Sequence, residues 1–212
     1  MDMITSYLVM HAVITADIVS STKGEIGIWL NSLKEALNQI GTNPKDWEIY
    51  RGDSFQLFIE DAERALAFGI KIKAAIKSTG DHDVRIAVGL GEKTHNAEKV
   101  TECNGSAFVN SGAKFEILKK EKQNMAIKSD FDQFDAEINL YLKLGLIAMD
   151  NWTANSAEVV QLMLDNPKMS QDEIGHLIGI RQNAVSYRIK RAYFYELMEM
   201  NEMYKTKLKS ML

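Results

Sequence analysis

Two aspartates in the N-terminal half could hold a metal ion. Asp17 follows an apolar, β-branched run, and Asp53 lies at the tip of a predicted hairpin, within Gly52-Asp53-Ser54. If the first strand and the hairpin are neighbours in one sheet, the two carboxylates converge. Two hard oxygen ligands open to phosphates suit Mg²⁺ or Mn²⁺. The alternative is that Asp17 merely ends a strand and caps a helix, while Asp53 is an ordinary turn residue.

The segment after Asp17 could hold phosphate oxygens. It contains Ser20, Ser21 and Thr22, continues through Lys23-Gly24, and leads into a predicted helix. Backbone N–H groups in such a turn, together with the positive end of the helix dipole, attract anions. With the two aspartates nearby, this segment predicts a nucleotide site.

Residues 170–192 have the pattern of two short helices joined by a tight turn. Ser170 and Glu173 form a capping box, Gly179 supplies the turn, and Val185 and Ile189 give the second helix an inner face. At 100° per residue, Asn183, Ser186, Tyr187 and Lys190 would face outward, and Arg188 and Arg191 would lie toward the edges. With Arg181 and Gln182, these are the candidate DNA-contacting residues. Amide and hydroxyl groups can read base edges, and Arg and Lys can contact phosphates, so we predict that this helix binds DNA. The alternative is an αα-hairpin that only packs or dimerises.

The N-terminal half resembles a family of enzymes. The run ADIVSST at residues 16–22 is similar to the F-A-D-I-V-G-S-T signature of class III nucleotidyl cyclases, and Gly52-Asp53 stands where that family has its second metal-binding aspartate. VRIAVG at 84–89 and GSAFVNSGAKFEIL at 105–118 follow in the family's order. The segment YRGDSF also resembles the signature of GGDEF cyclases, which share the palm fold.

This resemblance covers residues 8–129 and implies particular site residues. It implies a metal site at Asp17, Ile18 and Asp53, and nucleotide contacts from Asn110 and Lys114.

The resemblance is weaker at the positions that the family uses for catalysis and for reading the base. Ile49 occupies the position of the purine-reading lysine, and Cys103 that of the second base-reading acid. Lys114 replaces the family's arginine and so loses the bidentate fork for a phosphate. Ser54 stands at the position of the GGDEF glutamate. These differences favour a degenerate nucleotide- and metal-binding pocket, with a divergent nucleotidyl cyclase or nucleotidyltransferase as the alternative.

The C-terminal part resembles DNA-binding proteins. LIGIRQNAVSYRIKRA at 177–192 is similar to the helix-turn-helix of sigma-factor region four and LuxR-type regulators. With a palm-like N-terminal half and a helical connector, the architecture resembles the SatD family of small bacterial proteins. The two parts together favour a cytoplasmic, DNA-binding transcriptional regulator whose N-terminal domain binds a nucleotide or metal and modulates dimerisation. The second alternative is a non-catalytic interaction protein whose palm domain only dimerises.

Hydrophobic spacing predicts the elements that position these residues. The predicted strands are at 8–19, 47–51, 55–59, 84–90 and 125–128, and the helices of the first half are at 25–40, 65–76 and 106–119. The order β-α-β-β-α-β is that of the ferredoxin-like split βαβ unit, with an extra helix and strand appended. We therefore predict an α+β protein: a ferredoxin-like palm domain at 1–129, a connector helix at 130–152 and a helix-turn-helix domain at 153–212.

The predicted connector helix has two apolar faces. Phe131, Phe134, Ile138, Tyr141, Gly145 and Ala148 recur at the spacing of a seven-residue repeat, while Leu140, Leu144 and Ile147 form the second face. One small domain does not offer enough cover for both faces. We therefore predict a homodimer, which would set two recognition helices on a palindromic or pseudo-palindromic site.

Composition excludes several classes of protein. Hydrophobic residues make up 46% and charged residues 25%, which are globular values. The single cysteine excludes an intramolecular disulfide and favours the cytoplasm. No apolar stretch approaches the roughly 20 residues of a membrane span, and the start MDMITSYLVMHAV lacks the basic region of a signal peptide. The net charge is −5 over residues 1–150 and +1 over 151–212, so basic character is confined to the C-terminal part.

Overall fold

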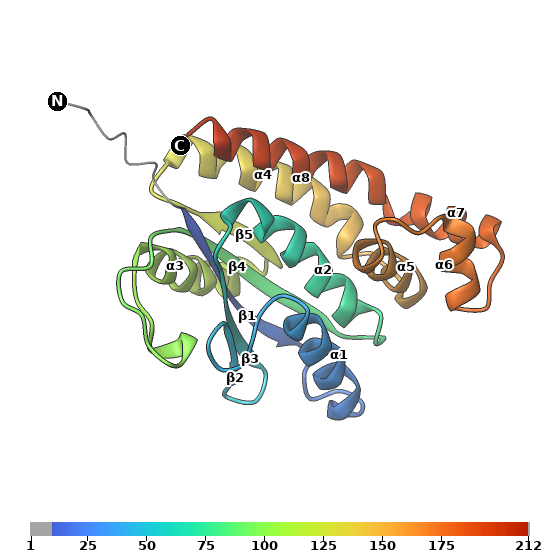
Figure 1. Cartoon of the computed structure of the whole chain (residues 1–212), viewed down its shortest axis with the longest axis horizontal. Coiled ribbons are helices and arrows are strands. Elements are labelled where there is room, and N and C mark those ends of the chain that lie inside the picture. The colour runs from blue at the N-terminus through green and yellow to red at the C-terminus, as the bar shows by residue number, and fades with distance from the viewer. Residues whose placement is uncertain (1–9, 212) are drawn as a thin grey trace.

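A five-stranded mixed sheet forms the centre of the structure, a computed structural model that describes residues 10–211 (Figure 1). Eight α-helices accompany the sheet within this range, so the protein is mixed α/β and compatible with the predicted α+β class. The first two residues of the predicted 8–19 strand, and most of the segment considered as a signal peptide, lie outside the described residues.

The sheet is antiparallel except at one edge. Its strands lie in the order β2-β3-β1-β4-β5, where β5 is parallel to β4 because the chain crosses over through α3. The strand bounds are His11–Val19 for β1, Trp47–Tyr50 for β2, Ser54–Ile59 for β3, Asp83–Gly91 for β4 and Met125–Lys128 for β5. All five predicted strands are present. The prediction that the first strand and the hairpin are neighbours in one sheet is confirmed, because β1 pairs with β3.

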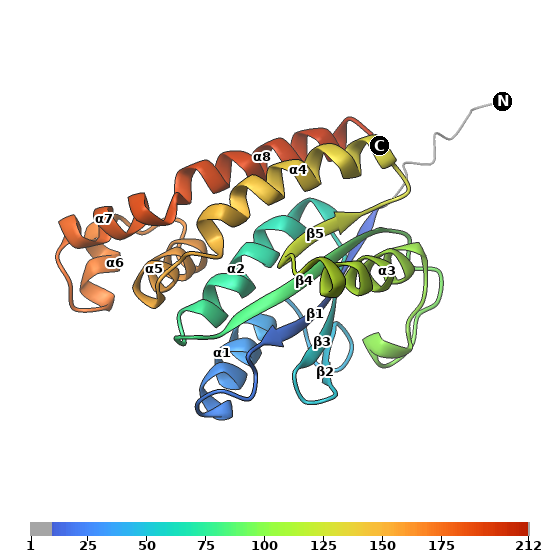
Figure 2. The same ribbon diagram turned by 180° about the vertical axis from the view of Figure 1, so that it is seen from behind.

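Helices cover both faces of the sheet, because successive side chains of the central strands β1 and β4 point to opposite faces and are mostly buried on both. In β1, Ile14 and Ile18 are buried in the main core cluster beneath α1 (Ile26–Asn38) and α2 (Ala65–Lys77). Val13, on the opposite face, packs with Phe108 of α3 (Ser106–Glu121). Figure 2 shows α3 on the far side of the sheet from α2.

The predicted connector is α4, Asp132–Met149. It packs one face on the core, through Phe134, Ile138, Leu142, Leu146 and Met149. Its second apolar face is left uncovered by the other residues between 10 and 211: Leu140 is 55% exposed, Leu144 59% and Ile147 68%. Within the described part of the chain, therefore, α4 is buried on a single side.

The C-terminal helices are α5 (Ala154–Asp165), α6 (Gln171–Leu177), α7 (Gln182–Ala192) and α8 (Phe194–Lys209). The last of them returns to the sheet layer and runs beside α4 (Figures 1 and 2). Tyr204 of α8 donates a hydrogen bond to the carbonyl of Ala62 at 2.6 Å.

One hydrophobic cluster includes residues of the sheet, α4, α5, α7 and α8. The three predicted segments, 1–129, 130–152 and 153–212, therefore share one core. No helix in the described part of the chain is long and apolar enough to cross a membrane.

Candidate functional site

Asp17 and Asp53 lie at the same end of the sheet. In the antiparallel pairing of β1 with β3, Asp17 is opposite Ser54, the residue after Asp53. The amide of Ile18 donates a hydrogen bond to the carbonyl of Asp53 at 3.0 Å, which ties the hairpin turn to the end of β1. The charge of Asp53 raises the pKa of Asp17, so the two carboxylates interact electrostatically.

Asp17 also has a cationic partner, which the sequence analysis did not include. Arg85 is opposite Asp17 in the β1–β4 pairing, and its Nη1 lies 3.2 and 3.1 Å from the two carboxylate oxygens. Burial is the largest cause that raises the pKa of Asp17, while the charges of Arg85 and then Lys119 lower it. The net result is a raised pKa. The candidate metal site is thus two carboxylates with a guanidinium beside one of them.

The predicted phosphate segment is tied to Asp53. The hydroxyl of Ser21 donates to Oδ2 of Asp53 at 2.6 Å, and the Trp29 indole donates to the carbonyl of Ser21 at 3.3 Å. Ser20 has a φ of 65°, in the left-handed region, which turns the chain sharply after β1. Thr22 is exposed. Of the three predicted residues, Ser21 is therefore the one that contacts a site carboxylate.

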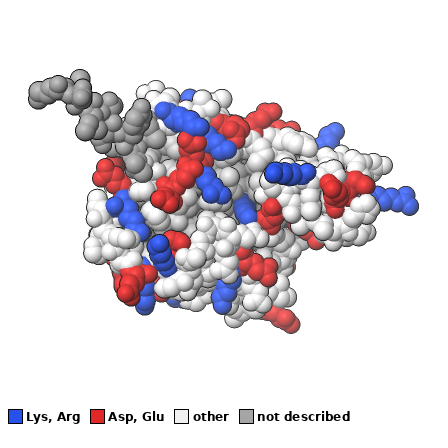
Figure 3. Space-filling view, viewed as in Figure 1, with Lys and Arg blue, Asp and Glu red and all other residues white. Residues whose placement is uncertain are grey.

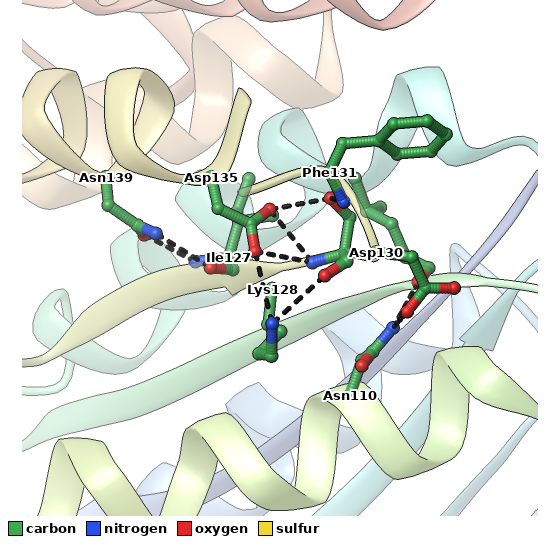
Figure 4. Close-up of polar contacts among 9 residues, drawn as sticks. Asn110, Ile127, Lys128, Asp130, Phe131, Asp135 and Asn139 are labelled. Carbon is green, nitrogen blue, oxygen red and sulfur yellow. Dashed lines mark hydrogen bonds and ion pairs between the residues drawn. The ribbon is translucent and has the colours of Figure 1, made fainter. Parts of the chain in front are cut away.

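Asn110 does not join this site. Its amide nitrogen donates to the carbonyl of Leu90 at 2.9 Å and to Asp130 at 3.3 Å (Figure 4). Leu90 pairs with Ala12, five residues before Asp17 along β1, a separation of roughly 16 Å at the rise of a β-strand. The Asn110 amide instead connects α3 to β4 and to the loop before α4.

The lysine of α3 whose charge reaches Asp17 is Lys119, which was not among the predicted residues. Its ammonium group lies over the Phe115 ring, 4.4 Å from the centroid. Lys114, the predicted phosphate ligand, is half-buried one turn earlier in α3. The resemblance pointed to Lys114 by motif position alone, whereas the electrostatic partner depends on how α3 lies across the sheet.

The polar cluster around the start of α4 is a closed network. Asp135 accepts from the Ser129 amide at 2.9 Å and from its hydroxyl at 2.7 Å, and Lys128 lies 3.6 Å away (Figure 4). Asn139 pairs with the Ile127 backbone through two bonds of 2.8 Å. These groups satisfy one another and anchor α4 to β5.

Asp17 and Asp53 alone supply few oxygen ligands for a metal ion that binds without a phosphate group. No group of three or more His, Cys, Asp or Glu side chains is placed to hold a metal ion within residues 10–211. Mg²⁺ often keeps several waters and binds through one or two carboxylates together with substrate phosphates. The chemistry of these two aspartates therefore fits an ion that is bound together with phosphate groups.

The α6–α7 pair is held together by a tight turn. The predicted capping box is present: Ser170 accepts from the Glu173 amide at 3.3 Å, and the Glu173 carboxylate accepts from the Ser170 amide at 2.7 Å. Gly179 has a φ of +70°. A Cβ at Gly175 would lie 2.6 Å from the Ile180 carbonyl oxygen, so only glycine allows this close approach.

The outer face of α7 is open. Val185, Ile189 and Ala192 are buried, as predicted for the inner face. The exposed residues are Arg181, Gln182, Asn183, Ser186, Tyr187, Lys190 and Arg191. In Figure 3, acidic and basic side chains are interspersed over the visible surface, and a basic side chain stands at the tip of the α6–α7 end. The exposure of this face contradicts a hairpin buried against the N-terminal part.

Four of the predicted DNA-contacting residues, Gln182, Tyr187, Arg188 and Arg191, have partners within the chain. Nη1 of Arg188 lies 2.8 Å from the carboxylate of Glu158 in α5, and Gln182 donates to Gln171 at 2.9 Å. The guanidinium of Arg191 lies 5.7 Å from the centroid of the Tyr187 ring. Arg188 is held at the flank of α7 that faces α5, so its charge is partly neutralised.

The sequence matches no protein-family model, and no curated protein matches it. Functional conclusions therefore depend on the residues and contacts described above.

Proposed function

We propose that the protein is a cytoplasmic DNA-binding transcriptional regulator in which α6 and α7 form a helix-turn-helix. The observation that carries this proposal is the division of α7 into a buried apolar face and an exposed face of amide, hydroxyl and basic groups. A recognition helix needs this division, because one side packs in its own domain while the other enters the major groove. The similarity of residues 177–192 to known helix-turn-helix segments supports the same function.

The exposed side chains divide by chemistry. Asn183, Ser186 and Tyr187 offer groups that can hydrogen-bond to base edges, and an asparagine amide can pair bidentately with adenine. Arg181, Lys190 and Arg191 supply charge for phosphates, which positions the protein without reading sequence. Arg188 can join them only if it leaves Glu158.

Binding of the wild-type protein to genomic DNA fragments tests this proposal. Fluorescence anisotropy at several salt concentrations between about 50 and 200 mM should give affinities that fall linearly with the logarithm of salt. One fragment class should bind more tightly than bulk DNA at every salt concentration. No detectable binding at low salt would overturn the proposal.

For the N-terminal part we propose a ferredoxin-like palm domain that binds a nucleotide with Mg²⁺ or Mn²⁺ and has lost cyclase activity. The strand order β2-β3-β1-β4 supports this fold, and the interaction of Asp17 with Asp53 supports the site. Ser21 and Arg85, which contact these carboxylates, are suited to phosphate oxygens. Both proposals together agree with a resemblance to the SatD family.

Thermal unfolding with a panel of nucleotides, each with and without Mg²⁺ or Mn²⁺, tests the ligand. Because the two aspartates supply few donors, the ion alone should shift the melting temperature little, whereas ion and nucleotide together should raise it. The double variant Asp17→Asn, Asp53→Asn should abolish the shift, and Asp81→Asn, exposed on the loop before β4, should retain it. A shift that survives the double variant would contradict the site.

A further inference from the structure

An apolar groove runs between α4 and α8. The helices are antiparallel, because Glu137 pairs with Lys207 at 2.8 Å while Gly145 contacts Leu197 and Met200. The groove has a volume of about 710 Å³. Its lining includes Tyr141, Gly145 and Ala148 of α4 and Leu197 and Met200 of α8. The absence of a side chain at Gly145 lets Met200 and Leu197 pack close to α4, because a Cβ there would lie 3.1 and 3.3 Å from them.

A ridge of exposed apolar side chains stands beside the groove. Leu144 and Ile147 project from α4 and are both more than half exposed, and Met203 projects from α8 on the other side. Leu140 extends the ridge by one turn. An uncovered apolar surface of this kind on a water-soluble fold marks a contact site for another molecule.

The two sides of this face carry opposite charge. At 100° per residue, Lys143 lies on the edge of α4 away from α8, while Glu196 and Glu199 line the groove on its α8 side. None of the three forms an ion pair with any other residue between 10 and 211. The face therefore runs from a positive edge at Lys143, across the ridge, to a groove whose α8 side is negative.

We propose that this face binds the same face of a second copy of the chain, about a two-fold axis parallel to α4 and α8. That axis sets α4 of each copy against α8 of the other. Leu144 and Ile147 of one copy then enter the groove of the other, and Lys143 of each copy meets the acidic α8 side of the other's groove. A second copy is favoured because it supplies both the ridge that fills the groove and charges opposite to those of Lys143 and the two glutamates.

The proposal does not depend on DNA binding and is tested without DNA. Sedimentation equilibrium of the full chain should give twice the 23.9 kDa of one chain at micromolar concentration. The double variant Leu144→Asp, Ile147→Asp should raise the dissociation constant at least about tenfold. Both residues are exposed, so the far-ultraviolet circular dichroism should be unchanged. Val109→Asp, at an equally exposed apolar residue of α3, is the matched control and should remain dimeric.

Charge reversal tests the orientation of the two-fold axis. Lys143→Glu and Glu199→Lys should each weaken the dimer, because each places like charges across the interface. The double variant Lys143→Glu, Glu199→Lys should recover most of the lost affinity. A monomeric wild type, which would leave this face for a different partner, overturns the proposal. So does a dimer that is insensitive to the Leu144 and Ile147 substitutions, and failure of the charge-reversed double variant to recover overturns the proposed axis.

Discussion

The ammonium group of Lys73, completely buried in α2, lies 2.7 Å from a carboxylate oxygen of Asp150 at the end of α4. The same ammonium group lies 2.6 Å from Asp83 at the start of β4. Lys77, one turn later, donates to the Asp150 carbonyl at 2.8 Å. Ion pairs of Lys73 and a hydrogen bond of Lys77 thus join α2 and β4 to Asp150, where the chain leaves α4 for the C-terminal helices.

Removal of the Lys73 charge should destabilise the whole fold. Lys73→Met leaves Asp150 without its cation and Asp83 with Lys77 alone, 3.3 Å away, and breaking a buried ion pair in this way costs about 3 kcal/mol. Urea unfolding measures the loss. Lys205→Met, which removes a surface pair with Glu202, should cost less than about 1 kcal/mol. Equal losses in the two variants would contradict the structural role of Lys73.

The stability contributed by Asp17 should depend on pH with a definite sign. Burial raises the pKa of Asp17 above its ordinary value of 3.8, so the folded state favours the protonated acid. This contribution is fully present below pH 3.8 and is lost as pH rises through the folded pKa. The wild type should therefore lose stability relative to Asp17→Asn as pH rises from about 4 toward neutrality.

Unfolding by urea at a series of pH values measures this difference. The change should be smaller in an Asp53→Asn background, because the charge of Asp53 raises the pKa of Asp17. A difference that is constant with pH, or that changes with the opposite sign, would show that Asp17 is not shifted as described.

Gly175 should not tolerate a side chain. Gly175→Ala would push its Cβ into the Ile180 carbonyl, and overpacking of this kind costs about 1–3 kcal/mol. Gly112→Ala is the control, since no atom lies within 4 Å of the added Cβ and the residue is within α3. That change should stabilise the protein by up to about 1 kcal/mol through helix propensity. Thermal unfolding distinguishes a loss at Gly175 from a gain at Gly112.

Release of Arg188 should strengthen DNA binding nonspecifically. Glu158→Gln removes the carboxylate 2.8 Å from the guanidinium and leaves it free for a phosphate. Each additional phosphate contact steepens the dependence of log affinity on log salt by about 0.9 unit. Asp172→Asn, an exposed residue of α6, removes a charge from the same end without freeing an arginine. If both variants change the slope equally, the effect is only net charge.

Arg191 and Asn183 should differ in the kind of binding that each supports. Arg191→Ala should weaken binding to all sequences and reduce the salt slope by about one unit. Asn183→Ala should cost about 1–3 kcal/mol for the preferred site only. Parallel titrations of specific and bulk DNA separate the two effects. A uniform loss on replacing Asn183 would mean that its amide does not read a base.

Local pattern was enough to predict most of the elements. The β-branched run that ends at Val19, and the turn Gly52-Asp53-Ser54 between two apolar runs, predict the strand and hairpin that bring Asp17 and Asp53 together. Ser170 and Glu173 predict the start of α6, because a capping box depends only on residues three apart.

Contacts between distant residues could not be predicted in this way. Arg85 meets Asp17 only because of the register of β4 on β1, and a shift of one residue would place it on the other face. The position of Arg188 toward the edge of a helical wheel gives no sign of Glu158, 30 residues earlier. Asn110 keeps its motif position, yet its amide is used within the fold, so motif position alone did not indicate its contacts.

The bond between Tyr204 and Ala62 joins residues 142 apart in sequence, and it has a consequence for synthesis. The surface of η1 (Ala62–Arg64) and α2 that α8 covers is translated first, whereas Tyr204 of α8 is translated 142 residues after Ala62. A nascent chain therefore carries this apolar surface uncovered while the intervening residues are added. Closure of the core must wait until α8 has left the ribosome, and the growing chain is most prone to aggregation in that interval.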